Sequence, residues 1–191
     1  MRRILIAVGS GVKGGNTDRL CDAFMDGARK AGHQVEKVFL GDLTFQGCRG
    51  CGACQLNGGK CVVRDDLQAI YPMNEAADTI VLASPLYFWT ISGRLTSFVD
   101  RFYAFSVEDR YPHKDAMLLM TAGDDHEWTF DRAIDYYRFL CKALGWTNLG
   151  EITAGGCKGE AKKRTIADSA LDAAKTTGLE MKDIAEENIA N

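Results

Sequence analysis

The chain has 191 residues and 46% hydrophobic content, enough to bury the core of one compact domain. Its 23 basic and 26 acidic residues give a formal charge of -3, without the excess positive charge that attracts nucleic acids. No apolar run reaches membrane-spanning length, and the first run ends at Gly9, too early for a signal-peptide core. We therefore expect one domain over residues 1–191, in the cytoplasm, with no nucleic-acid or membrane partner.

Short apolar runs alternate along the chain with segments of helical periodicity. This alternation is typical of an α/β three-layer sandwich, in which helices cover both faces of a parallel sheet. Three runs are almost wholly apolar, as central strands should be, and two are more mixed, as expected nearer the edges. The central strands are predicted at residues 4–8, 80–83 and 117–121, and the outer ones at 35–40 and 149–154. The sequence therefore predicts a five-stranded parallel sheet.

Apolar residues recur at helical spacing between and after these strands. We predict helices over residues 20–31, from about 66 with an interruption at Pro72, and over 95–102, 130–144 and 171–185. In the last of these, Gly178 costs about 1 kcal/mol of helix stability relative to Ala. The basic segment 158–164 could meet the 2′-phosphate of NADPH, but we interpret it as the solvated start of a helix.

The first strand leads into the sequence Gly-Ser-Gly-Val-Lys-Gly-Gly-Asn-Thr-Asp at residues 9–18, and a helix follows directly. Glycines such as Gly15 let backbone N–H groups converge on one point. The side chains of Ser10, Asn16 and Thr17 can donate hydrogen bonds, and the helix start adds its positive dipole end. The loop is therefore predicted to bind an anion, in preference to the alternative of a tight turn that binds nothing.

Two kinds of nucleotide compete for this loop. Gly9, Gly11 and Gly14 match the dinucleotide pattern G-x-G-x-x-G, but in that fold the helix begins within the motif. Here residues 14–16 extend the loop before helical periodicity begins. The wider loop favours a terminal phosphate monoester, as in FMN. The Walker pattern is excluded because the loop contains no Gly-Lys-Ser/Thr triplet.

Three consecutive aromatic residues, Tyr87, Phe88 and Trp89, follow the third strand. For strand order 2-1-3-4-5, the loops after strands one and three face one cleft at the switch point of the sheet. A phosphate-binding loop opposite an aromatic loop suits a ligand with a phosphate tail and a flat ring, such as FMN. The alternative is that these aromatics pack beneath the next helix or at a subunit contact. Strand four ends in small residues that let a ring approach the backbone, namely Thr121, Ala122 and Gly123.

The motif Gly-Ser-x-x-Lys-Gly-Gly-Asn-Thr, the tetrapeptide Ser-Pro-Leu-Tyr at residues 84–87 and the segment 95–101 resemble the NADPH-dependent FMN reductases of the flavodoxin superfamily. The resemblance covers nearly the whole chain and implies a flavodoxin-like fold, FMN as cofactor and NAD(P)H as electron donor. Family members often carry Pro-Arg where this chain has Gly11-Val12, so Lys13 is the only cation of the loop. The resemblance assigns Ser10, Lys13, Asn16 and Thr17 to the phosphate, Pro85, Leu86, Tyr87, Phe88 and Trp89 to the ribityl chain and ring, and Thr121, Ala122 and Gly123 to the ring edge.

Four of the seven cysteines lie in a segment, at about residues 41–64, that matches no predicted element. Loops of this length in compact domains are usually functional, and an odd, clustered cysteine set favours a reducing compartment. The spacing Cys48-x2-Cys51-x2-Cys54-x6-Cys61 supplies four thiolates for a 4Fe-4S cluster. Together with Asp65-Asp66, it resembles the motif of iron-sulfur flavoproteins, a branch of the same superfamily. A zinc site, and metal-free thiols that stay reduced or form a redox disulfide, are the alternatives.

The remaining candidates receive no chemical role. Cys21, Cys141 and Cys157 are interpreted as buried or incidental thiols, and His126 as part of a solvated acidic loop.

Three functions follow from these patterns. The first is an FMN-dependent NAD(P)H oxidoreductase that reduces a quinone, a flavin or a similar small acceptor, with no catalytic side chain required. The second is an iron-sulfur flavoprotein that relays electrons between a ferredoxin-like partner and FMN. The third is a non-redox phosphate-binding module with structural zinc. The exposed aromatic loop further predicts a homodimer or homotetramer that covers the flavin.

Overall fold

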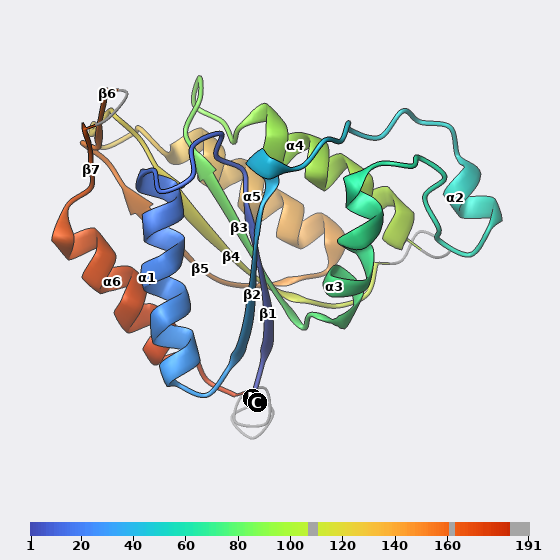
Figure 1. The fold of residues 1–191 in the computed structure, drawn as a ribbon, viewed down its shortest axis with the longest axis horizontal. Coiled ribbons are helices and arrows are strands. Elements are labelled where there is room, and N and C mark those ends of the chain that lie inside the picture. The colour runs from blue at the N-terminus through green and yellow to red at the C-terminus, as the bar shows by residue number, and fades with distance from the viewer. Residues whose placement is uncertain (107–110, 161–162, 184–191) are drawn as a thin grey trace.

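A computed structural model shows helices on both faces of a five-stranded parallel sheet (Figure 1). It describes residues 1–106, 111–160 and 163–183, without the side chain of Glu160. The strand order β2-β1-β3-β4-β5 confirms the predicted order and layers. The strands of the sheet are β1 Arg3–Val8, β2 Gln34–Phe39, β3 Thr79–Pro85, β4 Asp115–Thr121 and β5 Thr147–Ala154.

Helices form where the sequence repeats apolar residues every three or four positions, and they bury those residues on the sheet. The α-helices are α1 Asn16–Lys30, α2 Ala53–Leu56, α3 Tyr71–Ala76, α4 Gly93–Asp100, α5 Asp131–Leu144 and α6 Asp168–Leu179. Short 3₁₀ turns are η1 Leu40–Asp42, η2 Asp66–Ala69 and η3 Arg101–Phe105. None of these described helices combines the length and apolar character needed to cross a membrane.

Two apolar cores, one on each face, hold the layers together. On one face Leu20 and Phe24 of α1 pack on Ile6 and Val8, while on the other Leu95 and Phe98 of α4 pack near Leu82. Because successive residues of a strand point to opposite faces, each central strand contributes to both cores. Burial of each such large side chain stabilises the fold by about 1.5–3 kcal/mol, which explains why the central strands are almost continuously apolar.

The helices α1 and α6 approach each other closely because glycines face each other across their contact. A Cβ atom on Gly178 would lie 2.3 Å from the backbone oxygen of Phe24, and one on Gly27 would lie 2.0 Å from that of Lys175. Both distances are too short for any side chain. Gly178, a liability for an isolated helix, is therefore required by the packing of the two helices.

Three sequence predictions differ from the structure. The helix expected from about residue 66 is split into η2 and α3, with Pro72 in the first turn of α3, where proline is tolerated. The last helix ends at Leu179 instead of reaching Ala185, which lies outside the described residues. The basic segment 158–164 does not begin a helix: β6 Lys158–Glu160 and β7 Lys163–Thr165 form an antiparallel hairpin. Gly156, at φ +64, turns the chain out of β5 into this hairpin.

Strands β1, β3 and β4 all end at the same edge of the sheet. The register pairs Val8 with Ala83 and Pro85 with Thr121, so the loops that follow these strands meet there. Chain order reverses between β1 and β3, and ligands of doubly wound sheets bind beside such a switch point. Ligand-binding residues are therefore expected at this edge of the sheet.

Candidate functional site

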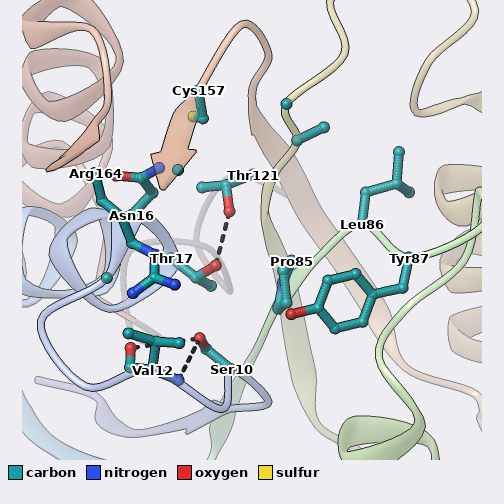
Figure 2. Close-up of a pocket in the computed structure, with 14 residues that line it drawn as sticks. Ser10, Val12, Asn16, Thr17, Pro85, Leu86, Tyr87, Thr121, Cys157 and Arg164 are labelled. Carbon is teal, nitrogen blue, oxygen red and sulfur yellow. Dashed lines mark hydrogen bonds between the residues drawn. The ribbon is translucent and has the colours of Figure 1, made fainter. Parts of the chain in front are cut away.

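Two adjoining hollows lie at this edge, and together they form one cleft. We call the first, of about 270 Å³, the polar pocket, and the second, of about 290 Å³, the aromatic pocket. They share four residues, Leu86, Tyr87, Ala122 and Gly123. Figure 2 shows the polar pocket, with Ser10, Asn16 and Thr17 facing Pro85 and Tyr87 across the hollow. The loops after β1, β3 and β4 thus meet as the sequence predicted.

The loop after β1 is fixed at its start by the elements beside it. The backbone N–H of Gly9 donates to the Ala83 oxygen at 2.7 Å, and the Ser92 hydroxyl donates to the Gly9 oxygen at 2.7 Å. A Cβ atom on Gly9 would lie 2.6 Å from Leu95 Cβ and 2.8 Å from Ser92 Oγ. Only glycine lets the chain pass between β3 and the start of α4.

The second half of the loop is shaped by Asp18. Its Oδ2 accepts a hydrogen bond from the backbone N–H of Gly14 at 2.7 Å, and its Oδ1 lies 2.7 Å from Lys37 Nζ. Gly14 has φ +69, a left-handed conformation that glycine adopts without steric cost. Lys37 balances the charge of Asp18, so this carboxylate holds the loop without presenting a negative charge to the pocket.

Donor groups are available where α1 begins. Within the described residues, the backbone N–H groups of Asn16, Thr17 and Asp18 make no hydrogen bond, and Gly15 provides no side-chain cap. The Thr17 hydroxyl is 2.7 Å from the Thr121 hydroxyl, which joins the helix start to the end of β4. Unpaired amides together with the positive end of a helix make a site for an anionic group.

The aromatic pocket is built on a tight turn. Tyr87 and Thr90 exchange backbone hydrogen bonds of 3.0 and 3.1 Å, while Phe88 and Trp89 between them have φ +48 and +61. Left-handed conformations of such bulky residues cost roughly 1–2 kcal/mol each. The turn leaves the Phe88 side chain 93% exposed at the rim of the cleft. Retained strain of this kind points to a functional loop.

A second group of aromatic residues borders this turn. The Trp89 ring lies 6.1 Å from the Trp128 ring, and His126 stacks on Trp128 at 5.3 Å. Nε2 of His126 is 3.4 Å from Asp124 Oδ1, and Asp124 lines the aromatic pocket. The His126 side chain is largely exposed, as expected for a solvated loop, and its ring also lies beside the cleft.

Every residue assigned to FMN from the sequence lines one of the two pockets except Lys13. The structure does not bring Lys13 into the cleft, because its Nζ lies 2.7 Å from Asp42 on η1 and over the ring of Phe39. Five further residues line the pockets without having been assigned to FMN, namely Val12, Asp124, Cys157, Gly159 and Arg164. Gly159 and Arg164 belong to the basic segment 158–164, for which a phosphate contact was the alternative to a helix start. Cys157 lies in the loop after β5, at the same edge of the sheet as the loops after β1, β3 and β4. Its place after a predicted strand could therefore have indicated that it lines the cleft.

The four clustered cysteines line a separate small cavity, the cysteine pocket. Cys54 is buried on α2, Cys61 is half-buried, and Cys48 and Cys51 are exposed. A backbone hydrogen bond from Ala53, and then the Arg49 side chain, lower the pKa of Cys51, favouring the thiolate that binds metals. Figure 1 places α2 and the β6–β7 hairpin at opposite ends of the molecule, so this pocket is distinct from the cleft.

Arg101 ties the two ends of the cysteine segment together. Its Nη1 donates to the Gln46 oxygen at 2.9 Å and to Asp65 Oδ2 at 2.7 Å, while Asp65 Oδ1 accepts from the Leu67 N–H at 3.2 Å. Asp66 adds a further bond, accepting from the Thr44 N–H at 2.6 Å. Asp65 and Asp66 therefore hold the two ends of the cysteine segment together.

Two buried polar atoms beside Cys61 lack hydrogen-bond partners among the described residues, Tyr71 Oη and Arg101 Nε. Burial raises the pKa of Tyr71, whose hydroxyl lies near the Cys61 thiol without a hydrogen bond of ordinary geometry. Unpaired donors beside one of the four cysteines suit a group with negatively charged sulfur atoms, and a 4Fe-4S cluster bound by four thiolates is such a group. In the described residues no three potential ligands are already grouped for a metal ion.

The profile of one protein family, described as NADPH-dependent FMN reductase, matches residues 2–144. This chain belongs to that family. Among curated proteins, it is 36% identical over 94 residues to an iron-sulfur flavoprotein of Archaeoglobus fulgidus, covering 49% of this chain and 42% of the relative. The chain thus spans less than half of that relative's length in the match.

Solved structures show the same fold. The NAD(P)H:quinone oxidoreductase of Methanothermobacter marburgensis superposes with a TM-score of 0.73 at 16% identity, covering 95% of this chain and 99% of that one. An FMN-dependent NADH-azoreductase of Bacillus anthracis, in complex with FMN, gives 0.63 at 15% identity, covering 98% and 99%. These likenesses show the flavodoxin-like fold of the chain.

The cleft of this FMN reductase family member is suited to FMN in its own geometry. The amides of α1 can donate hydrogen bonds to a phosphate at one end, and the aromatic turn borders space for a flat ring at the other. Asn16 lines the polar pocket, and its buried Oδ1 has no hydrogen-bond partner among the described residues. A ribityl hydroxyl could donate to this oxygen. FMN can therefore satisfy the unpaired polar groups that line the cleft.

Proposed function

We propose that the protein binds one FMN along the cleft and uses it to pass reducing equivalents from NAD(P)H to a small acceptor such as a quinone or a flavin. The observation that carries the proposal is the meeting, at one edge of the sheet, of three unpaired amides of α1 with the aromatic turn Tyr87–Thr90. Family membership supports it.

The roles of the residues follow from their positions. The amides of Asn16, Thr17 and Asp18 and the Ser10 hydroxyl would hold the phosphate, while Pro85, Leu86 and Tyr87 would line the ribityl chain. Thr121, Ala122 and Gly123 present small side chains along the edge where the ring would lie. Bound FMN supplies the redox chemistry by accepting hydride or single electrons, so the protein needs no acid, base or nucleophile.

The aromatic pocket is where donor and acceptor would bind in turn. It is bordered by Phe88 and Trp89 and is open to solvent on their side, since both side chains are strongly exposed. Flat apolar molecules gain about 0.5–1.5 kcal/mol from each well-oriented aromatic contact. An open, aromatic entrance therefore favours flat acceptors over bulky ones.

Anaerobic mixing of the FMN-loaded protein with NADPH or NADH tests this function. We expect the visible flavin absorbance to fall as NADPH or NADH reduces the flavin. Addition of a quinone should restore this absorbance by reoxidising the flavin. The variant Phe88→Ala should raise KM for the quinone, whereas Phe139→Ala, which removes an equally aromatic and 70% exposed side chain from α5, should not. Flavin that stays oxidised with both nucleotides would refute the NAD(P)H assignment.

A second candidate function rests on the cysteine pocket. Here the protein would be an iron-sulfur flavoprotein in which Cys48, Cys51, Cys54 and Cys61 hold a 4Fe-4S cluster that exchanges electrons with a ferredoxin-like partner and with FMN. The unpaired Tyr71 Oη and Arg101 Nε favour it. The cysteine pocket lies at the opposite end of the folded molecule from the β6–β7 hairpin, which borders the cleft. This relay therefore suits a homodimer or homotetramer, in which the cysteines of one copy can approach the cleft of another.

Anaerobic purification with iron, sulfide and zinc analysis separates the candidates. The cluster predicts about four irons per chain and broad visible absorption beneath the flavin bands. Cys51→Ser should lose both, and Cys141→Ala, which changes a buried cysteine of α5 outside the pocket, should keep them. Iron-free yellow protein that oxidises NADPH rapidly would rule out the cluster and support the first function. Colourless protein that retains zinc but not added FMN would favour the non-redox module.

A further inference from the structure

The polar pocket has one charged side chain among the described residues that line it, and that side chain is Arg164. A phosphate monoester carries up to two negative charges, and binding sites for such groups usually add a cation to the helix dipole. Two lysines on or beside the loop after β1 are already paired. Lys13 pairs with Asp42, and Lys37 pairs with Asp18 and Asp22. The cation available to the pocket therefore comes from outside the loop after β1.

The β6–β7 hairpin carries Arg164 to the start of α1. Asn16 Nδ2 donates to the Lys158 oxygen at 3.2 Å, and Arg19 Nη1 reaches the Arg164 oxygen at 3.4 Å, so the hairpin is attached to α1 at two points. Arg164 lies opposite Gly159 in the hairpin register, and its Nε and Cγ pass about 4 Å from where a Gly159 Cβ would be. These are ordinary van der Waals distances, so the arginine stem lies against the hairpin beside Gly159.

The guanidinium is directed at the loop it would complement. Figure 2 shows Arg164 extending from the hairpin toward Thr17 and Val12, on the side of the hollow where Ser10 also lies. Within the described residues its guanidinium has no ion-pair or hydrogen-bond partner. Binding an anion therefore breaks no ion pair within the part of the chain that the structure describes. The planar fork of arginine can also bind two phosphate oxygens at once.

We propose that Arg164 is the cation that binds the FMN phosphate. It is supplied by the β6–β7 hairpin, which follows the last strand of the parallel sheet in the sequence. This inference rests on the proposed binding of FMN in the cleft. The same phosphate chemistry occurs in the 2′-phosphate of NADPH, and the two sources differ in what the loss of Arg164 changes. A cofactor contact alters FMN affinity, whereas a donor contact alters the preference for NADPH over NADH.

Flavin-free protein titrated with FMN and with riboflavin tests the proposal, because riboflavin lacks only the phosphate. Removing a charge-assisted contact should weaken FMN binding about 10- to 100-fold in Arg164→Gln and leave riboflavin affinity unchanged. Arg164→Lys should fall between, since it keeps the charge and loses the fork. Lys163→Gln makes the same charge change one residue away, on the exposed side of the hairpin, and should bind FMN like the wild type.

Each other outcome counts against the assignment in a different way. Equal FMN affinity in wild type and Arg164→Gln, or equal losses for FMN and riboflavin, would overturn it. A raised KM for NADPH alone, with NADH and FMN unaffected, would move Arg164 to the electron donor and overturn it too. Wild-type protein that binds neither flavin would instead overturn the proposed function on which the inference depends. Matching thermal midpoints of the variants serve as the folding control.

Discussion

Replacing Gly9 by alanine tests how the fold sets the position of the loop after β1. The added Cβ would lie 2.6 Å from Leu95 Cβ and 2.8 Å from Ser92 Oγ, both in α4 or its cap, and 3.3 Å from the Ala83 oxygen. Ordinary carbon–carbon contacts are about 3.5–4.0 Å, so β1 and α4 must separate by roughly 1 Å. Overpacking of this size costs about 1–3 kcal/mol. The same shift would displace the amides of α1, and losing one good hydrogen bond to phosphate weakens FMN about 10-fold.

The matched control is Gly11→Ala in the same loop. A Cβ on Gly11 meets nothing within 4 Å, so this change should alter the free energy of unfolding by less than about 1 kcal/mol. Urea denaturation of the flavin-free proteins measures stability, and FMN titration measures affinity. Equal unfolding midpoints for the two variants would show that the crowding between Gly9 and α4 is not real, and the account of how the loop is positioned would be wrong.

Three further predictions address the helices, the edge strand and the cysteine pocket. Gly178→Ala should destabilise the protein by more than about 1 kcal/mol, although alanine favours helices, because its Cβ would meet the Phe24 oxygen at 2.3 Å; a stabilised variant in thermal denaturation would contradict the α1–α6 contact. A hydrogen bond from Arg138, and a weaker one from Asn148, lower the pKa of Glu151. The ion pair with Arg138 therefore stabilises the fold at pH values above the ordinary pKa of glutamate, and this stabilisation is lost as pH falls through the lowered pKa. Glu151→Gln should thus be less stable at pH 7 by up to about 1 kcal/mol, since Arg138 is exposed, and this stability difference should close in denaturation curves as pH falls through the lowered pKa of Glu151; a constant difference would argue against the pair. Tyr71→Phe should be neutral or stabilising by up to about 1 kcal/mol in metal-free protein, where the hydroxyl lacks a partner, but should speed iron loss to a chelator from reconstituted protein; equal rates of loss would show that the hydroxyl does not face the cluster.

The sheet and its main helices followed from the sequence because their signals are local. Central strands such as β3 are buried on both faces and read as unbroken apolar runs, and α1 shows a clear apolar stripe that ends at Gly32. The placing of the cleft needed only the rule that ligands lie at the switch point of a doubly wound sheet. That rule brought Thr17, Tyr87 and Thr121 together correctly, across more than a hundred residues of chain.

The charges of the site could not be predicted in the same way. Lys13 lies in the loop motif, but whether its charge reaches the cleft depends on Asp42, which η1 places beside it. Arg164 lies in a segment whose hairpin depends on long-range contacts with α1 instead of on local periodicity. Side-chain partners set by tertiary contacts leave no pattern in the sequence, and the same is true of Gly178, whose neighbour Phe24 belongs to another helix.

Titration of the flavin-free protein with FMN, followed by flavin fluorescence, tests whether the cleft binds FMN. We expect quenching that saturates at one FMN per chain, because the aromatic turn and the end of β4 would enclose one ring. Folded protein that shows no saturable quenching would contradict the assignment of the cleft to FMN.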